Sequence, residues 1–242
     1  MKKQELIFDQ NYEGALTLSK VSKFYGEENQ FKALDNVSLQ VFTGQFVVIL
    51  GASGSGKSTL LNLIGGMDDA SCGEINFAGV DLTQLSEKIL ARYRKEIVGF
   101  VFQFYNLMPN LSALENVEIS ELAYGMSAID ALKMVGLEDK KFSFPSELSG
   151  GEQQRVSIAR AIVKNPKILL CDEPTGAVDS NTGKKIIELL LNLNEKKDKI
   201  ILVVTHNSAI AEVADRVIKL SDGKIVSDII NKNPKKIEEI EL

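Results

Sequence analysis

A glycine-rich stretch, Gly51-Ala52-Ser53-Gly54-Ser55-Gly56-Lys57-Ser58-Thr59, directly follows the apolar run 46–50. It fits the pattern G-x-x-x-x-G-K-[ST] in the context that this pattern requires, a strand before the loop and a helix after it. Backbone N–H groups and a helix N-terminus then converge on one point, and such a point binds phosphate. We therefore predict a nucleotide-phosphate loop, with Lys57 on the β- and γ-phosphates and the Ser58 hydroxyl on Mg²⁺. A chance glycine-rich turn is the alternative.

Composition narrows the class of protein. The chain has 242 residues, 44% hydrophobic and 25% charged, which suits one large globular domain. A net charge of -5 disfavours a nucleic-acid partner, which normally meets a basic face. No apolar run approaches the roughly 18 residues of a membrane span, and the amino terminus does not fit a signal peptide. Cys72 and Cys171 lack metal-ligand spacing and fit a reducing cytoplasm.

Alternating apolar residues predict strands before the glycine-rich stretch. Residues 15–21 alternate as a half-buried strand does, Tyr25 follows in a turn, and residues 33–46 alternate again. Thr43-Gly44-Gln45 is predicted to be a hairpin connection into the strand 46–50. These residues together predict an N-terminal antiparallel β-lobe. Residues 1–13 are expected to be a loosely held arm.

Beyond the loop, strands and helices alternate, which predicts a parallel, right-handed α/β core. Helical patterns with Pro and Gly interruptions between 104 and 147 predict a helical insertion. The expected fold class is α/β: a P-loop NTPase core with a mostly parallel sheet, an N-terminal antiparallel β-lobe and an inserted α-helical subdomain. Helices are expected at 57–64, 86–95, 152–164, 180–195 and 209–214, and strands at 74–77, 97–102, 167–171 and 199–204.

Two adjacent carboxylates, Asp172 and Glu173, end the apolar run 168–171. Ligands of α/β sheets bind at the carboxyl ends of strands, so the pair is expected on the same edge as the phosphate loop. Neighbouring residues of a strand point in opposite directions, so the two carboxylates are expected to differ in role. Asp172 would hold Mg²⁺, and Glu173 would polarise the water that attacks the γ-phosphate. A solvated acidic turn is the alternative.

The segment Leu148-Ser149-Gly150-Gly151-Glu152 opens an apolar-periodic helix. Ser149 followed three residues later by Glu152 fits a plain capping box, a purely structural feature. A helix start with two glycines also fits an anion site, by the same physics as the phosphate loop. The residues by themselves leave both interpretations open.

In this order, the phosphate loop, Gln103, 148–152, the Asp172-Glu173 pair, 177–179 and His206 resemble the ATP-binding subunit of ABC transporters. The resemblance extends from about residue 17 to residue 226. Segments 100–107, 114–117 and 172–177 resemble the macrolide-exporter and lipoprotein-release branch. Three features depart from that pattern: Glu152 stands where Gln is commoner, Val178 where Leu is usual, and the stretch 118–135 is shorter.

The resemblance implies roles for particular residues. Tyr25 would stack on adenine, although an aromatic beside a turn is often only packing. Gln103 would sense Mg²⁺ and the attacking water, and Asp179 would communicate across a dimer interface. His206, the only histidine, would contact the γ-phosphate, whereas a lone histidine is usually structural. Ser149, Gly150 and Gly151 would clamp the γ-phosphate of ATP held by a second subunit.

The resemblance also implies an organisation and a set of partners. We expect one ABC ATPase domain over 15–230, with 15–103 and 152–230 as core and β-lobe and 104–151 as helical subdomain. Residues 1–14 and 231–242 are expected to be tails, the second a frayed helical one.

The expected protein is the ATP-hydrolysing subunit of a bacterial ABC transporter, an ATPase that takes ATP and Mg²⁺. We expect a head-to-tail dimer that drives a separate ABC permease of the peptide-, drug- or lipoprotein-export type. It would be cytoplasmic, reaching the membrane's inner face only through that permease, with the permease contact near residues 104–111. The main alternative is a regulatory ATPase that signals through a permease-like partner, as in cell-division relatives. A DNA-repair or translation ATPase would need a coiled-coil insertion or two tandem cassettes, and a small-molecule kinase would leave His206 unexplained.

Overall fold

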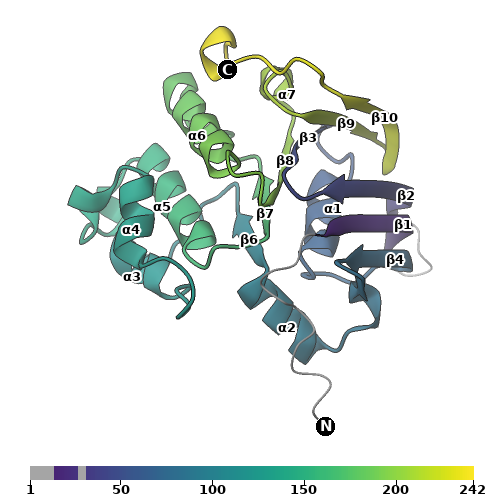
Figure 1. The fold of residues 1–242 in the computed structure, drawn as a ribbon, viewed down its shortest axis with the longest axis horizontal. Helices are drawn as coiled ribbons and strands as arrows, with labels where there is room; N and C mark the ends of the chain where they lie inside the picture. Colours follow the sequence, from purple (N-terminus) through teal and green to yellow (C-terminus); the bar gives the residue numbers. More distant parts are fainter. Residues whose placement is uncertain (1–13, 27–30) are drawn as a thin grey trace.

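The computed structural model describes residues 14–26 and 31–242, which form two sheets with helices around them (Figure 1). The expected arm, residues 1–13, lies outside the described residues. One sheet is antiparallel, in the order β2-β1-β4-β5, and the other has six strands in the order β10-β9-β3-β8-β7-β6. Pairing within the second sheet is parallel except between β9 and β10. The expected fold class is confirmed.

The antiparallel sheet is formed by β1 (Ala15–Tyr25), β2 (Phe31–Phe42), β4 (Cys72–Phe77) and β5 (Val80–Asp81). Two of its four strands follow the phosphate loop in the chain, so the lobe is only partly N-terminal. β1 extends beyond the expected strand and includes Tyr25 as its last residue, directly opposite Phe31 of β2. The pairing places these two aromatic side chains on the same face.

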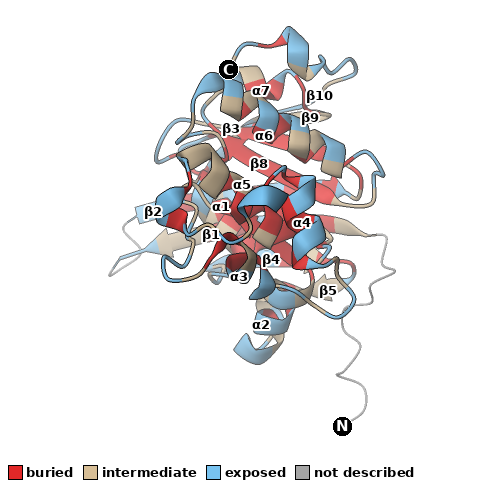
Figure 2. Cartoon of the chain, turned by 90° about the vertical axis from the view of Figure 1, so that its left-hand side faces the viewer, coloured by how far each residue is buried: buried red, intermediate tan, exposed pale blue. Residues whose placement is uncertain are grey.

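The six-stranded sheet is the centre of the molecule and is covered on both faces. Along β3 (Phe46–Leu50), Val47 and Ile49 join a core shared with the antiparallel sheet, whereas Phe46 and Val48 join a core under the helices on the opposite face. A strand buried on both faces reads as a continuous apolar run, which is how residues 46–50 read in the sequence. Figure 2 shows buried residues concentrated in the central strands, with exposed residues on the outer helices.

The predicted hairpin connection at residues 43–45 is wrong. β2 and β3 belong to different sheets, and β3 pairs in parallel with β8 (Ile200–Thr205) and β9 (Arg216–Ser221). The Gly44 N–H donates to the Lys199 carbonyl oxygen, so the connection is tied to the residue before β8. The change from alternating to continuous apolar character at residue 46 marks the passage from one sheet to the other.

The remaining elements agree with the expected alternation, with two omissions. The remaining core strands are β6 (Val98–Val101), β7 (Ile168–Asp172) and β10 (Lys224–Ile230), and the helices are α1 (Lys57–Ile64), α2 (Glu87–Glu96), α3 (Ala113–Glu118), α4 (Ala128–Met134), α5 (Gly150–Ile162), α6 (Ser180–Leu193) and α7 (Ser208–Ala211). The sequence interpretation missed β9 and β10. Helices α3, α4 and α5 gather on the side of the sheet away from the β-lobe (Figure 1).

The last residues differ from the expected frayed helical tail. Ile237–Glu239 form a single 3-10 turn, and Ile240 is only 3% exposed in the core cluster that includes α6. The Lys235 N–H donates to the Glu212 carbonyl oxygen, which holds the segment against the end of α7. Burial of an apolar side chain therefore anchors these residues, which their charged composition did not indicate.

Candidate functional site

The phosphate loop has the predicted strand–loop–helix context, between β3 and α1. Gly56 precedes α1 with a φ of 99°, and Gly54 has a φ of 79°. A Cβ at Gly56 would also lie 2.4 Å from the Ala33 carbonyl oxygen, so a side chain is excluded there on two grounds. The loop consequently directs the first N–H groups of α1 at one point, which is the geometry of an anion site.

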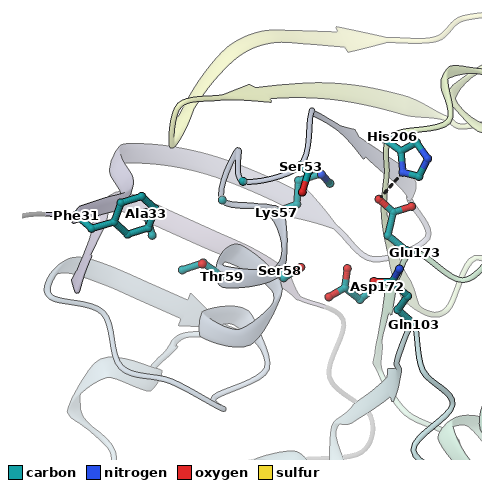
Figure 3. A pocket seen from close by; sticks show the side chains of 12 residues that line it. Phe31, Ala33, Ser53, Lys57, Ser58, Thr59, Gln103, Asp172, Glu173 and His206 are labelled. Atoms are coloured by element: carbon teal, nitrogen blue, oxygen red, sulfur yellow. Dashed lines mark hydrogen bonds and ion pairs between the residues drawn. The ribbon is translucent and has the colours of Figure 1, made fainter. Parts of the chain in front are cut away.

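A cavity of about 560 Å³ opens above this loop, within the size range of small-molecule sites. The phosphate loop, Gln103, the Asp172-Glu173 pair and His206 meet here, since the cavity lies at the carboxyl ends of β3, β6, β7 and β8 (Figure 3). The lining residues are Phe31, Ala33, Ser53, Gly54, Gly56, Lys57, Ser58, Thr59, Gln103, Asp172, Glu173 and His206.

Lys57 is a buried cation at the start of α1, with an exposed fraction of 7%. Its ammonium donates to the carbonyl oxygens of Gly51 and Ala52, each at 2.9 Å. A buried ammonium requires such partners, because leaving it unpaired would cost several kcal/mol. The cation lines the cavity, so an anion there would meet both a positive charge and the helix N-terminus.

Asp172 ends β7 and faces Ser58 at the start of α1. Burial raises the pKa of the Asp172 carboxyl, and the charge of Glu173 raises it further, whereas the Ser58 hydroxyl and Lys57 oppose this shift. A hydroxyl and one carboxylate fit Mg²⁺, which binds few protein oxygens and completes its shell with phosphates and water. The described residues contain no cluster of three or more His, Cys, Asp or Glu side chains placed for a metal.

The expectation that Asp172 and Glu173 point in opposite directions along one strand is wrong. The strand ends at Asp172, and Glu173 has a φ of 46°, so the two carboxylates are not alternating strand residues. Both line the same cavity. The Glu173 carboxylate accepts a hydrogen bond from Thr205 Oγ1 at 3.0 Å and lies 3.0 Å from His206 Nδ1. These two neighbours hold the side chain of Glu173, a residue that is only 9% exposed. The positive φ of Glu173 is a strained backbone conformation, and such strain is typical of functional sites.

The helix start at Ser149 has both the capping box and the two-glycine helix start, the two features that the sequence left open. Ser149 Oγ accepts from the Glu152 N–H, and the Glu152 carboxylate accepts from the Ser149 N–H at 2.8 Å, so the capping box is present. Gly151 is also needed for packing, since a Cβ there would lie 2.3 Å from Thr182 Cγ2. Ser149, Gly150 and Gly151 are absent from the lining of the phosphate cavity. The structure therefore separates this part of the predicted site from the rest.

Asp179 and Tyr25 also lie outside the lining of that cavity. Asp179 caps α6, accepting from the Thr182 N–H at 3.0 Å and from the Thr182 hydroxyl at 2.7 Å. The Tyr25 hydroxyl donates to Asp68 at 2.6 Å, and partial burial raises the pKa of Tyr25. Its ring remains beside the site through its cross-strand partner Phe31, which does line the cavity.

Three residues of the site were missed from the sequence. Phe31, 58% exposed, and Ala33 line the cavity, and the Thr205 hydroxyl donates to the Glu173 carboxylate. Thr205 could have been found, because it is the polar residue at the carboxyl end of an apolar strand, the position that marked Asp172. Phe31 carried no such signal. Its place in the site depends on the register between β1 and β2, and the local sequence around residue 31 does not determine that register.

These features define a nucleotide-binding ATPase of the P-loop class, with the phosphate loop, a strand-end carboxylate pair and a histidine at one sheet edge. A family model described as ABC transporter matches residues 34–176. The chain belongs to this family. It is an ATP-binding and ATP-hydrolysing subunit, and such subunits dimerise and pair with membrane permeases.

Two related proteins and one solved structure are similar to this chain over most of its length. The chain is 45% identical over 211 residues to the lipoprotein-releasing system ATP-binding protein LolD of Syntrophus aciditrophicus, covering 84% of this chain and 95% of that one. It is 44% identical to the macrolide export ATP-binding/permease protein MacB of Photorhabdus laumondii, covering 88% of this chain but 34% of that longer one. A solved dimer of the cassette MJ0796 bound to ADP and Pi superposes with a TM-score of 0.83 at 43% identity, covering 90% of this chain and 99% of the other.

The family and the branch expected from the sequence are confirmed. No helix within residues 14–26 and 31–242 combines the length and apolar character needed to cross a bilayer.

Proposed function

We propose that this chain hydrolyses Mg²⁺-ATP in two sites shared head-to-tail between two copies of itself. One observation carries the proposal. The Ser149–Gly151 helix start is suited to bind an anion, yet it does not line the phosphate cavity of its own chain. A two-fold pair can place that helix start over the partner's γ-phosphate, and each site is then complete.

Within each site the residues divide the work. Lys57 and the loop N–H groups bind the phosphates, and Ser58 with Asp172 would hold Mg²⁺, which neutralises phosphate charge when bound. Glu173, held by Thr205 and His206, is placed to accept a proton from the attacking water. Gln103 lines the cavity beside the two carboxylates and is placed to orient that water. Tyr25 and its partner Phe31 would flank the adenine.

Glu173→Gln tests this function. The substitution removes the base but keeps every proposed ligand of the nucleotide, so ATP should persist and hold two chains together. We expect a dimer by gel filtration with light scattering in ATP and a monomer in ADP, which lacks the γ-phosphate.

Adding Ser149→Arg, which places a long side chain in the facing surface, should return the ATP sample to monomer. A monomer of the Glu173→Gln variant in ATP, with nucleotide binding confirmed separately, would count against the shared site. A dimer that ignores the nucleotide would do so as well.

The permease contact is proposed on the loop after β6, within residues 104–111. Phe104 and Met108 are 76% and 54% exposed there. The loop is held from within, because the buried Asn116 side chain accepts from the Met108 N–H at 2.7 Å and donates to the Leu111 carbonyl oxygen at 2.9 Å. Leu107 packs on the core instead of facing outward. The two exposed apolar side chains are therefore presented on a rigid loop next to Gln103.

A cavity of about 230 Å³ between β6 and α5 adjoins this loop. Phe100 and Phe102 stack within it at 4.3 Å, and Arg94, Arg160 and Lys164 surround them. Burial lowers the pKa of Lys164 to about 8, with the charge of Arg160 as a second cause. A cavity lined by both apolar and basic side chains suits an apolar partner segment that carries an acidic residue.

By this route the chain would reach the inner face of the membrane through its permease alone. The names of the related proteins favour export of a drug-like or lipid-anchored substrate. We propose one cassette over 15–230, with 104–151 as the helical subdomain that carries the permease contact.

A further inference from the structure

Tyr105 lies where three functional segments of the chain meet. It follows Gln103 in the loop after β6, and its hydroxyl donates to the Ala177 carbonyl oxygen at 3.3 Å, in the loop between Glu173 and Asp179. The same hydroxyl oxygen would lie 2.8 Å from a Cβ at Gly150, the first residue of α5. The phenol oxygen of Tyr105, in the segment after β6, therefore bonds the segment after β7 and leaves no room for a side chain at the start of α5.

The backbone of Tyr105 is held in a conformation that side chains rarely adopt. Tyr105 and Asn106 have φ values of 55° and 49°. Arg160, two to three turns along α5, donates to the Tyr105 carbonyl oxygen at 2.8 Å and to the Asn106 carbonyl oxygen at 2.6 Å. Burial lowers the pKa of this guanidinium, so the two carbonyls are the partners that its charge requires. Strained backbone persists where its surroundings over-determine it; here Arg160 of α5 holds the backbone of Tyr105, and the Ala177 carbonyl oxygen accepts from its hydroxyl.

We propose that Tyr105 is a positioning residue that sets the spacing between the Ala177–Asp179 loop and the Ser149–Gly151 helix start. The inference rests on the proposed shared site, in which both segments face the partner chain. The hydroxyl acts through these segments and touches no nucleotide. Its loss changes how well the two chains fit together around ATP and leaves the phosphate cavity of each chain intact.

The first test is Tyr105→Phe, which keeps the ring and removes only the hydroxyl. The loss of one net hydrogen bond predicts a decrease in kcat of about fivefold, with KM for ATP unchanged. In the Glu173→Gln background, the same substitution should weaken the ATP-dependent dimer by about fivefold or more, since each dimer contains two such bonds. Binding of a fluorescent ATP analogue to the monomer should not change.

Tyr93→Phe is the matched control. It also removes a tyrosine hydroxyl that donates to a backbone carbonyl, that of Ile64 at 3.0 Å, but in the buried side of α2. We expect it to lower the melting temperature while leaving kcat and the dimer constant unchanged. A purely structural role for Tyr105 would give the same pattern as this control.

The second test uses the close approach to Gly150. With the hydroxyl present, Gly150→Ala places a Cβ 2.8 Å from it; without the hydroxyl, the next atoms are the Ala177 carbonyl oxygen at 3.6 Å and the ring Cζ at 3.7 Å. Gly150→Ala should therefore lower kcat by a smaller factor in the Tyr105→Phe background than in the unaltered chain. This non-additivity is specific to contact between the two residues.

The inference is overturned if Tyr105→Phe leaves kcat and the dimer constant unchanged, if KM changes in place of kcat, or if the effects of Gly150→Ala and Tyr105→Phe simply add. Failure of the shared site itself is distinguishable, because the Glu173→Gln chain with tyrosine at 105 would then stay monomeric in ATP. An effect of Tyr105→Phe in a chain that does dimerise separates the two questions.

Discussion

At the scale of single residues, the site holds two buried charges, and burying a charge without partners would destabilise the fold. Lys57 is 7% exposed and Glu173 is 9% exposed, yet both have partners: two loop carbonyls for the cation, and Thr205 with His206 for the carboxylate. Each group is therefore oriented before any nucleotide binds. Such preorganisation is how an enzyme avoids reorganising its polar groups during the reaction.

Lys57→Ala should abolish ATP hydrolysis and weaken ATP binding by about 100-fold, because a buried charge-assisted contact to phosphate is lost. Folding should be retained, since the side chain bonds only carbonyls of its own loop. Calorimetric ATP titration with a phosphate-release assay checks both effects, and circular dichroism checks the fold. Lys20→Ala, an exposed lysine of β1, is the control. Unchanged ATPase activity in Lys57→Ala would contradict the phosphate-loop assignment.

At the scale of elements, the start of α5 is held by a capping box and an ion pair. Its start is capped by Ser149 and Glu152, and Glu152 also accepts from Lys140 at 2.5 Å. Lys140 is the first cause, and the Ser149 N–H the next, by which the pKa of Glu152 is lowered to about 2. Because the folded pKa lies below the ordinary value of 4.5, this contribution to stability is present above pH 4.5 and disappears as the pH falls towards about 2.

Glu152→Gln should lower the free energy of unfolding at pH 7 by only about 0.5 kcal/mol, since the Lys140 side chain is 46% exposed and solvent screens the pair, and glutamine can still complete the capping box. The loss should shrink between pH 4.5 and 2. Urea unfolding at pH 7 and pH 3 measures it. Lys140→Met should cost about the same, and the double variant little more. A loss of several kcal/mol, or one independent of pH, would contradict this account of the pair.

Element boundaries could be predicted well where periodicity is strong. The expected positions of α1, α2, α6 and β7 lie within two residues of the observed ends. Pairing was harder, because the sequence around residues 43–45 has hairpin composition, whereas the partners of β3 lie more than 150 residues further along the chain. Turn chemistry is local, but the choice of a strand's neighbour depends on burial of both its faces.

At the scale of the whole molecule, one exposed apolar surface lies next to the nucleotide site. Phe104 and Met108 lie on the loop that follows Gln103, and the basic cavity between β6 and α5 adjoins them. A surface of this kind on a chain with a nucleotide switch suits transmission to a partner. Movement at the γ-phosphate would reach that partner through one loop.

Phe104→Glu combined with Met108→Glu should abolish co-purification with the cognate permease, because two charges replace the apolar contact. Basal ATPase activity of the isolated chain should remain within about twofold, since surface substitutions usually perturb the fold little. Phe142→Glu, at a phenylalanine 71% exposed elsewhere in the helical subdomain, is the matched control and should keep the permease. Retained permease binding by the double variant would place the contact on another surface.

The sequence by itself determined the chemistry of this protein. The phosphate loop, the Asp172-Glu173 pair and His206 each follow an apolar strand, and the carboxyl ends of parallel strands meet at one edge, so their convergence followed from local pattern. Only the tertiary structure decided which residues stand next to them: Phe31 through strand register, Thr205 on the Glu173 carboxylate, and Tyr105 against Gly150 and Ala177. Those contacts join residues 6 to 72 positions apart. Local periodicity carries no information on such distances, because packing of the whole core sets them.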